Sequence, residues 1–400
     1  MTAVTFASTG LDPDQRLARE RFAAFADEHL VPHADAWDAA GGLPPAVVAL
    51  LADHGYLGAA VPVGHGGEGL DEIGFGMLCE EVGRACSSVR SLLTVHSMVS
   101  HAVARWGSAG QRERWLPELA SGRAVGAFAL TEPGAGSDAG AITTRAERVP
   151  GGYALTGHKH WITCAGIAGV FLVFAKLDGA PTAFLVERDR PGLSVVPREG
   201  ALGTRASHLG DVLLDDCRVP ADARVSRPGF GLTAVGASAL ELGRYSVAWG
   251  CVGLVEACAA ASLAHADTRE QFGRPLREHQ LVQRMLADMV TAAAAARLLC
   301  RQAGLLRQAG DPRSVQATWL AKYFAAGAAM RAADDAVQVH GARGVAGDHP
   351  VQRYLRDAKV MEIIEGSTQL QQITIAEAAY MFRDRSEPDR SPGRQWSVTT

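Results

Sequence analysis

Apolar residues recur every three or four positions along the first 125 residues, as the buried face of an amphipathic helix requires. Clear examples are RLARERFAAFADEHLVPHADAWD and GFGMLCEEVGRA. A third segment, LPPAVVALLADHG, begins near proline and ends with glycine, which are common helix boundaries. The pattern predicts an N-terminal helical domain over residues 1–125.

Between residues 126 and 233 the pattern changes to short apolar or alternating runs, which are typical of strands. Turn-forming residues separate the runs, as in Pro150-Gly151-Gly152 and Asp178-Gly179. Because no helical pattern lies between them, we expect a middle domain of antiparallel strands rather than β-α-β units. The runs are GAFALTEP, GYALTG, VFLVFAK, TAFLVER and DVLLDDCRV.

Long helical patterns return after residue 233. The first extends from about Ala234 to Arg269, and two more follow in HQLVQRMLADMVTAAAAARLLCRQAG and SVQATWLAKYFAAGAAMRAADDAVQVHG. Long helices rich in small residues commonly pack as a bundle, so we expect a C-terminal four-helix-type domain over residues 234–383. The Pro-, Ser- and Arg-rich tail at 384–400 is expected to be disordered. The predicted fold class is therefore α+β, in the order helical, β, helical.

Composition narrows the function classes. The 400 residues include 39 Lys and Arg against 43 Asp and Glu, giving a net charge of −4, so we expect no nucleic-acid partner. No basic segment followed by an apolar run marks the N-terminus, and apolar runs such as GVFLVFA at 169–175 are too short to span a bilayer. Seven cysteines without a C-x-x-C pair indicate buried thiols in a reducing compartment. These features predict a cytoplasmic protein without a membrane partner.

Three motif matches carry little weight. GHGGEG at 64–69 fits G-x-G-x-x-G, but the acidic residue expected about twenty positions later in a dinucleotide fold is missing. His158 and His160 would face one side of a strand, yet no Cys, Asp or Glu cluster accompanies them in the sequence, so no metal is expected. A hydrolase is also disfavoured because no G-x-S-x-G elbow is present.

Three segments carry candidate chemistry. TEPGAGSD at 131–138 follows a strand and could bring backbone N–H groups close to an anion or a planar ring, although a tight turn needs the same residues. GHKHWIT at 157–163 would place Trp161 and Thr163 on one face of a strand, where Trp161 could also be core. In RDAKVMEIIEGSTQLQQ at 356–372, Glu365 is either a partly desolvated base or the first acid of the next helix.

The order in which these segments occur along the chain is more informative than any one of them alone. TEPGAGSD, GHKHWIT, TREQFGRPLREHQLVQ, QVHGARG and RDAKVMEIIEGSTQLQ together resemble the acyl-CoA dehydrogenase family over about residues 12–382. The resemblance implies an FAD-dependent enzyme in which Glu365 removes the α-proton of an acyl thioester, while the β-hydrogen leaves as hydride to flavin N5. The backbone N–H of Glu365 would hold the thioester oxygen.

The resemblance also assigns the remaining site residues. Contacts to the isoalloxazine ring would come from Phe128, Leu130, Thr131, Gly136, Ser137, Trp161 and Thr163. Contacts to the FAD of a neighbouring subunit would come from Arg269, Phe272, Gln280, Gln338 and Gly341. Ser367 and Gln369 would complete the flavin contacts, and Ser137, Arg244 and Gly366 would contact substrate. These assignments imply a homodimer or homotetramer that binds FAD between subunits.

Shorter strings point to a subgroup. CSSVRS, SVAWGCVGL and AKVMEIIEGS resemble dehydrogenases acting on acyl groups tethered to acyl carrier protein in polyketide extender-unit pathways, such as the hydroxymalonyl and methoxymalonyl routes of antibiotic biosynthesis. Ile364 stands where the family often has Tyr and should reshape the acyl pocket. Arg90 lies in a helical segment whose family counterpart lines that pocket, so it could read an oxygenated acyl group. A solvated or ion-paired surface arginine is the more common situation.

Three classes of function therefore follow from the sequence: a dehydrogenase, an oxygen-using flavoenzyme and a silent scaffold. The leading one is an acyl-thioester dehydrogenase that acts on a short or oxygenated acyl group carried by acyl carrier protein or coenzyme A, and passes electrons to an electron-transfer flavoprotein. The alternatives on the same fold are an ordinary short-chain acyl-CoA dehydrogenase of catabolism and an oxygen-using flavin oxidase. A catalytically silent scaffold that binds carrier protein is a third class.

Overall fold

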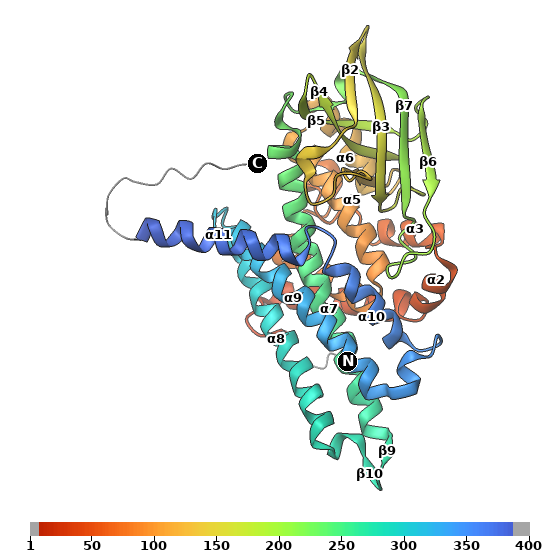
Figure 1. Ribbon diagram of the computed structural model, residues 1–400, viewed down its shortest axis with the longest axis vertical. Coiled ribbons are helices and arrows are strands. Elements are labelled where there is room, and N and C mark those ends of the chain that lie inside the picture. The colour runs from red at the N-terminus through yellow and green to blue at the C-terminus, as the bar shows by residue number, and fades with distance from the viewer. Residues whose placement is uncertain (1–7, 387–400) are drawn as a thin grey trace.

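The computed structural model describes residues 8–386, and side chains up to residue 380. Helices form the first part of the chain (Figure 1), where an N-terminal capping box on Asp12 begins the first of them. These helices are α1 (Pro13–Phe25), which continues as a π-helix (Ala26–Leu30), α2 (Ala34–Ala40), α3 (Pro45–Asp53), α4 (Glu72–Ala85), α5 (Ser87–Trp106) and α6 (Ala109–Ala120).

The middle of the chain forms one eight-stranded sheet, in the order β6-β7-β3-β2-β4-β5-β8, with β1 paired to β4. Most neighbours are antiparallel, but β1 runs parallel to β4, and so does β2. The expectation of a purely antiparallel domain was therefore wrong for these two pairs. The strands are β1 (Gly126–Ala129), β2 (Arg145–Val149), β3 (Gly152–Ile162), β4 (Val170–Leu177), β5 (Ala180–Glu187), β6 (Leu193–Pro197), β7 (Gly210–Pro220) and β8 (Arg224–Val225).

Helices return after the sheet, confirming the predicted order of helical, β and helical regions. A π-turn at Gly231–Gly236 leads into the longest helix, and a small hairpin separates that helix from the next. The elements are α7 (Ala237–Thr268), β9 (Glu270–Gln271), β10 (Arg274–Pro275), α8 (Gln280–Gln308), α9 (Ser314–His340), α10 (Pro350–Met361) and α11 (Thr368–Ser386). Since α11 reaches Ser386, the tail predicted to begin at 384 starts inside a helix, and residues 387–400 lie outside the described residues.

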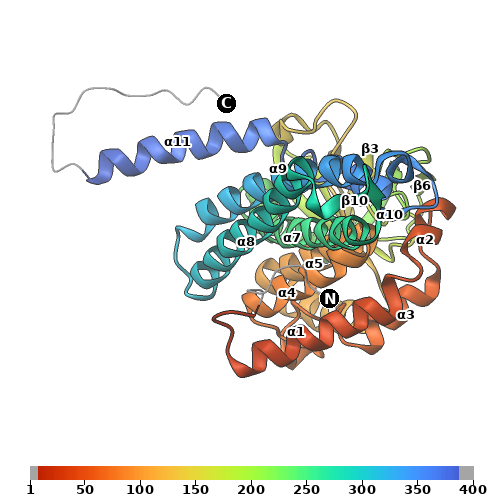
Figure 2. The same cartoon turned by 90° about the horizontal axis from the view of Figure 1, so that it is seen from below.

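Helix α7 is the central element of the molecule. It lies between the N-terminal helices α4 and α5 on one side and α8 and α9 on the other (Figure 2). The approach to α4 is close, because a Cβ added at Gly253 would lie 2.0 Å from the carbonyl oxygen of Glu80. Within the described residues, the stretch Gly231–Thr268 is apolar and long enough to cross a membrane, contrary to our expectation, but 78% of its most apolar window is buried.

Buried charge accompanies this apolar core. Glu80 on α4 accepts hydrogen bonds from Arg19 on α1 and Arg297 on α8, and Arg297 also donates to Glu256 on α7. The seven cysteines are buried and free, as the sequence predicted. The helical domains therefore pack around α7 as one unit, with the sheet at one end and the β9-β10 hairpin at the other (Figure 1).

Candidate active site

The base of the TEPGAGSD loop is fixed by the buried side chain of Glu132. Its carboxylate accepts hydrogen bonds from the backbone N–H and hydroxyl groups of Thr143 and Thr144, at 2.5–3.0 Å, and from Lys159 Nζ at 2.7 Å. Burial alone would raise the pKa of Glu132, but these donors outweigh it and hold the pKa at about 2. Lys159 also donates to the carbonyl of Leu130, so the loop is attached to β3 at its first residues.

The tip of the same loop is open. Gly136 and Ser137 are exposed, and the carbonyl of Thr131 accepts a hydrogen bond of 2.8 Å from the N–H of His160. The structure thus brings the loop beside the strand that carries Trp161. Phe128 packs against Phe174 with ring centroids 4.9 Å apart, so one face of its ring belongs to the core.

Trp161 is not a core residue. Its side chain is 49% exposed, its φ of 57° is unusual for a bulky residue, and the Arg198 guanidinium carbon lies 4.6 Å from its ring centroid. The ladder between β3 and β7 shifts register between Lys159 and Ile162, where β3 ends. Thr163 therefore lies in the following turn, and the prediction that it shares a strand face with Trp161 was wrong.

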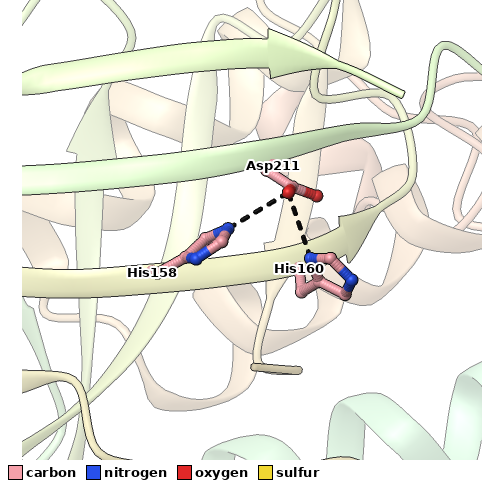
Figure 3. Close-up of side chains that lie close together, drawn as sticks. All are labelled: His158, His160 and Asp211. Atoms are coloured by element: carbon pink, nitrogen blue, oxygen red, sulfur yellow. Dashed lines mark hydrogen bonds and ion pairs between the residues drawn. The ribbon is translucent and has the colours of Figure 1, made fainter. Parts of the chain in front are cut away.

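His158 and His160 face one side of β3, as predicted, but they are not alone. Their Nε2 and Nδ1 atoms lie 3.1 and 3.0 Å from the same oxygen of Asp211 on the neighbouring strand β7 (Figure 3). The expectation that no acidic residue accompanies them was therefore wrong. Arg198 donates hydrogen bonds to both oxygens of Asp211, so its guanidinium supplies the positive charge that a metal ion would otherwise supply there. In the part of the chain that is described, this is the one cluster with metal-ligand composition, and its arginine disfavours a metal ion.

Glu365 lies in the turn between α10 and α11 rather than at the start of α11. Both Glu365 and Gly366 are left-handed, with φ of 55° and 95°. Arg244 Nε donates to the carbonyl of Glu365 at 3.0 Å, and Lys322 Nζ donates to the carbonyl of Gly366 at 2.9 Å. Gln371 adds a second donor to the Gly366 carbonyl at 3.0 Å. The turn is thus held by three buried or largely buried side chains from different elements.

Burial raises the pKa of Glu365, and the charges of Arg244, Lys322 and Arg90 act in the opposite direction. Its Oε2 atom is enclosed and accepts no hydrogen bond from the described residues. A carboxylate in this state is a stronger base than an exposed one, as the first interpretation of Glu365 predicted. The alternative, an acid that begins the next helix, was wrong, because α11 begins at Thr368.

Arg90 is fully buried on α5, with 1% of its surface exposed, so the surface-arginine interpretation was wrong. Its guanidinium donates to Thr94 Oγ1 at 2.9 Å, to Ser91 Oγ at 3.0 Å and to Met361 Sδ at 3.1 Å. Within the described residues it makes no salt bridge. A buried guanidinium whose partners are all neutral is energetically unfavourable. This marks the position as a candidate ligand site.

Two further positions assigned to the flavin, Ser367 and Gln369, follow the base on the chain. The hydroxyl oxygen of Ser367 accepts a 3.3 Å hydrogen bond from the N–H of Leu370 in the first turn of α11. Gln369 is exposed on the same turn.

The residues assigned to a neighbouring subunit's cofactor gather at the other end of the molecule. Phe272, in the hairpin β9-β10, is 95% exposed, and Arg269, Gln280 and Gly341 are exposed as well. The hairpin lies at the end opposite the sheet (Figure 1). Gln338 lies in the last turn of α9. One chain does not bring these residues to the loop at 131–138, which is the arrangement that a site shared between chains requires.

Several features of the turn and the loop fit FAD. A half-exposed tryptophan beside an open Gly-rich loop can cover a flat aromatic ring. Near the base, two enclosed oxygens lack a hydrogen-bond donor among the described residues, Glu365 Oε2 and Gln371 Oε1. Buried acceptors without partners indicate that another molecule completes the site.

Sequence reasoning missed three polar positions that help to hold the candidate site in place. Lys322 was hidden in an Ala-rich helix, where its spacing from Thr318, Ala325 and Ala329, all buried, was the available signal. Asp211 and Glu132 lie 51 and 27 residues from their respective partners His160 and Lys159. The pairing of β3 with β7 brings Asp211 to His160, and the loop after β1 brings Glu132 to Lys159.

Comparison with known proteins agrees with this geometry. Residues 12–123, 127–217 and 229–380 match the models "Acyl-CoA dehydrogenase, N-terminal domain", "Acyl-CoA dehydrogenase, middle domain" and "Acyl-CoA dehydrogenase, C-terminal domain". The mitochondrial short-chain specific acyl-CoA dehydrogenase of Mus musculus is 34% identical over 93% of this chain and 91% of its own.

Several solved structures are also similar to this chain in sequence and in fold. FkbI, for biosynthesis of the methoxymalonyl extender unit of the Fk520 polyketide, is 40% identical with a TM-score of 0.83, covering 91% of this chain and 99% of its own. The prolyl acyl carrier protein oxidase AnaB is 25% identical with a TM-score of 0.89, covering 92% and 100%. A glutaryl-CoA dehydrogenase of Mycobacterium smegmatis in complex with FADH2 is 29% identical with a TM-score of 0.89, covering 94% and 98%. These matches extend over nearly the whole chain, so the protein belongs to the acyl-CoA dehydrogenase family of flavin-dependent oxidoreductases acting on CH–CH groups.

Proposed function

We propose that this enzyme dehydrogenates a short, oxygenated acyl group held as a thioester on acyl carrier protein in secondary metabolism. Glu365 would be the base that removes the α-proton. The observation that carries the proposal is that Arg90 is buried without an acidic partner. Arg90, on α5, packs against the same face of α7 as Glu365 does.

Glu365 is suited to the proton transfer by its position. Its enclosed Oε2 faces Gly243 of α7, where an added Cβ would lie 2.7 Å from that oxygen. Because burial disfavours its ionised form while nearby cations favour it, the carboxylate can accept a proton and release it again. The backbone N–H of Glu365 would hold the thioester oxygen, which acidifies the α-carbon. The chemistry supplied by bound FAD is acceptance of hydride from the β-carbon.

Arg90 lies further along the same row. An added Cβ at Gly250 would be 2.7 Å from Arg90 Cδ, and Gly243 and Gly250 are two helical turns apart, about 10 Å along α7. Between them, Thr94 Oγ1 and Ser246 Oγ share a 2.6 Å hydrogen bond. An acyl group extending from Glu365 along this row would meet hydroxyls and then a guanidinium. A polar, oxygen-bearing acyl group can accept further hydrogen bonds from these groups, whereas a plain alkyl chain cannot.

The carrier is the second part of the proposal. It is supported by the similarity to FkbI and to AnaB, whose names refer to an extender unit and to an acyl carrier protein. We expect the enzyme to act in the cytoplasm as a homo-oligomer and to pass electrons to an electron-transfer flavoprotein.

The test is anaerobic flavin reduction, followed as loss of the oxidised-flavin absorbance. Matched acyl thioesters of coenzyme A and of acyl carrier protein are compared, each with an oxygenated and a butyryl-type acyl group, on wild type and Glu365→Gln. We expect reduction by wild type only, fastest with the oxygenated group on carrier protein.

Other outcomes decide between the alternatives. Faster reduction by butyryl-coenzyme A would identify an ordinary short-chain dehydrogenase of catabolism. Rapid reoxidation of the reduced enzyme by air, with peroxide formed, would identify an oxidase. Equal reduction of wild type and Glu365→Gln would exclude Glu365 as the base, and a purified protein that contains no flavin would leave only the scaffold interpretation.

A further inference from the structure

The left-handed turn at Glu365 and Gly366 is held by cations at two consecutive carbonyl groups. Arg244, from α7, donates to the first carbonyl, and Lys322, from α9, donates to the second. Non-glycine residues with positive φ are strained, so Glu365 keeps this conformation only because its surroundings impose it.

Lys322 is the less ordinary of the two cations. Its side chain is fully buried in the middle of α9, and in the part of the chain that the structure describes it makes no salt bridge. It donates a hydrogen bond to a neutral carbonyl oxygen, that of Gly366. A buried ammonium group without a carboxylate is destabilising, and burial lowers its pKa to about 8.

The charged and titratable groups around this turn come from four elements. Arg90 lies on α5, Glu241, Arg244 and Cys251 on α7, and Glu362 directly after α10. Arg244 is partly neutralised by Glu241, 3.8 Å away. Lys322 has no salt-bridge partner among the described residues, and the charges of Glu365 and Glu362 act on it from a greater distance.

We propose that Lys322 is a positioning residue for the base: it fixes the Gly366 carbonyl, and so the left-handed turn, and its charge keeps Glu365 ionised at working pH. The proposal rests on the proposed role of Glu365. The fixed turn sets the direction of both the Glu365 carboxylate and its backbone N–H. Loss of the Lys322 charge would raise the pKa of Glu365 further, since that charge now acts to lower it.

The experiment separates charge from anchoring with three variants of the holoenzyme. Lys322→Met removes both the charge and the donor, Lys322→Gln keeps a neutral donor, and Lys322→Arg keeps the charge. Lys359→Met, at a half-exposed lysine paired with Glu362, is the matched control. Each is assayed for flavin content and for the rate of anaerobic flavin reduction across a pH series.

We expect Lys322→Met to lower the reduction rate at neutral pH by about tenfold or more and to move the rising limb of the pH profile to higher pH. Lys322→Gln should move the limb in the same direction with a smaller loss of maximal rate, and Lys322→Arg should restore its position. A structural role alone would lower the rate equally at every pH and leave the midpoint unchanged, which would overturn the proposal.

Two further comparisons distinguish failure of the inference about Lys322 from failure of the proposed role of Glu365. If Lys322→Met does not retain flavin, the Lys322→Gln and Lys322→Arg pair still decides, because a pH midpoint that is the same in both excludes a charge effect. Glu365→Gln is run in parallel: if it reduces flavin as fast as wild type, the role of Glu365 fails. If Glu365→Gln is inactive while all Lys322 variants keep the wild-type midpoint, only the inference about Lys322 fails.

Discussion

The buried carboxyl group of Glu365, the proposed base, lowers the stability of the folded protein at neutral pH. Burial raises its pKa above the ordinary value of 4.5, and the surrounding cations only partly offset this. The folded protein therefore binds the Glu365 proton more tightly than the unfolded chain does. The sign of the linkage follows: folding is unpenalised below pH 4.5 and loses stability as rising pH ionises the buried carboxyl group.

We predict that Glu365→Gln makes the holoenzyme more stable than wild type at neutral and mildly alkaline pH, by about 1 kcal/mol or more. The advantage should disappear as the pH approaches 4.5, where wild-type Glu365 is protonated. Thermal unfolding of both proteins over a pH series measures this difference. Glu20→Gln, on the exposed face of α1, is the control and should show no such trend. A difference that stays constant with pH would contradict the linkage.

Arg90 provides a prediction about specificity. Arg90→Ala should lower the turnover of short oxygenated acyl thioesters by about 10- to 100-fold while largely sparing butyryl-type thioesters, because only the former use the guanidinium. Steady-state rates with both substrate classes measure the effect, and Arg90→Lys should recover part of it. Equal losses on both classes would assign Arg90 to the core alone.

The sequence could not show whether these residues are buried, because the burial of a helical residue depends on all the neighbours of the helix. Arg90 lies on α5, which is in contact with α4, α6, α7 and β1, so even its polar positions are enclosed. Glu365 was recognised by its motif, but its desolvation was only one of two interpretations. Lys322 gave no signal beyond its spacing, since the turn that it holds is 44 residues further along the chain.

At the scale of elements, the β domain depends on one buried ion pair between the loop after β1 and the strand β3. Lys159 Nζ lies 2.7 Å from Glu132 Oε1, and both side chains are almost fully buried. The pair connects the Gly-rich loop at 131–138 to the strand that carries Trp161. Since the pKa of Glu132 is lowered to about 2, its contribution to stability is present above pH 4.5 and lost as pH falls toward 2.

We predict that Glu132→Gln and Lys159→Met each destabilise the protein by about 3 kcal/mol, because each leaves an unpaired buried charge. The double variant should lose clearly less than the sum of the two, since it removes both charges. Urea unfolding of all four proteins gives the coupling energy, and flavin content reports the loop. Additive losses would show that the two side chains act independently.

Element types were predictable where burial is regular. The five strands with apolar runs were predicted and confirmed, but β2, β6 and β8 were missed. β2 reads RAERV and β6 reads LSVVP, and both leave most side chains partly or fully exposed, so no alternation of apolar and polar residues marks them. The parallel pairing of β1 and β2 with β4 depends on the path of the chain between them, which hydrophobic periodicity does not describe.

At the scale of the whole molecule, the two sets of residues expected to contact FAD lie at opposite ends of one chain. The loop at 131–138 adjoins the sheet, whereas the exposed Phe272 belongs to the hairpin β9-β10 at the far end of the helices (Figure 1). Assignment by family motifs could list both sets, but spacing along the chain could not show that they are far apart. A closed, symmetric assembly would join each set to the other set of a neighbour.

This arrangement predicts complementation between two inactive chains. Arg269→Ala keeps its own base but lacks the arginine offered to a neighbour, and Glu365→Gln keeps the arginine but lacks the base. Co-expressed with two different tags and purified through both, the mixed assembly contains sites with an intact Glu365 and an intact Arg269 from the other chain. In a dimer formed at random from equal amounts, about a quarter of wild-type sites would be restored before tag selection.

Flavin content and anaerobic flavin reduction of the mixed assembly measure this restoration. The control is Arg90→Ala co-expressed with Glu365→Gln and assayed on an oxygenated thioester. Arg90 and Glu365 serve one site from the same chain, so mixing these two variants should restore nothing. Restoration by the first pair and none by the second would place FAD between subunits, because only a residue contributed across an interface can be replaced by a neighbour. Activity no higher than the sum of the separate variants would mean that each chain completes its own site, and would remove Arg269 from the cofactor contacts.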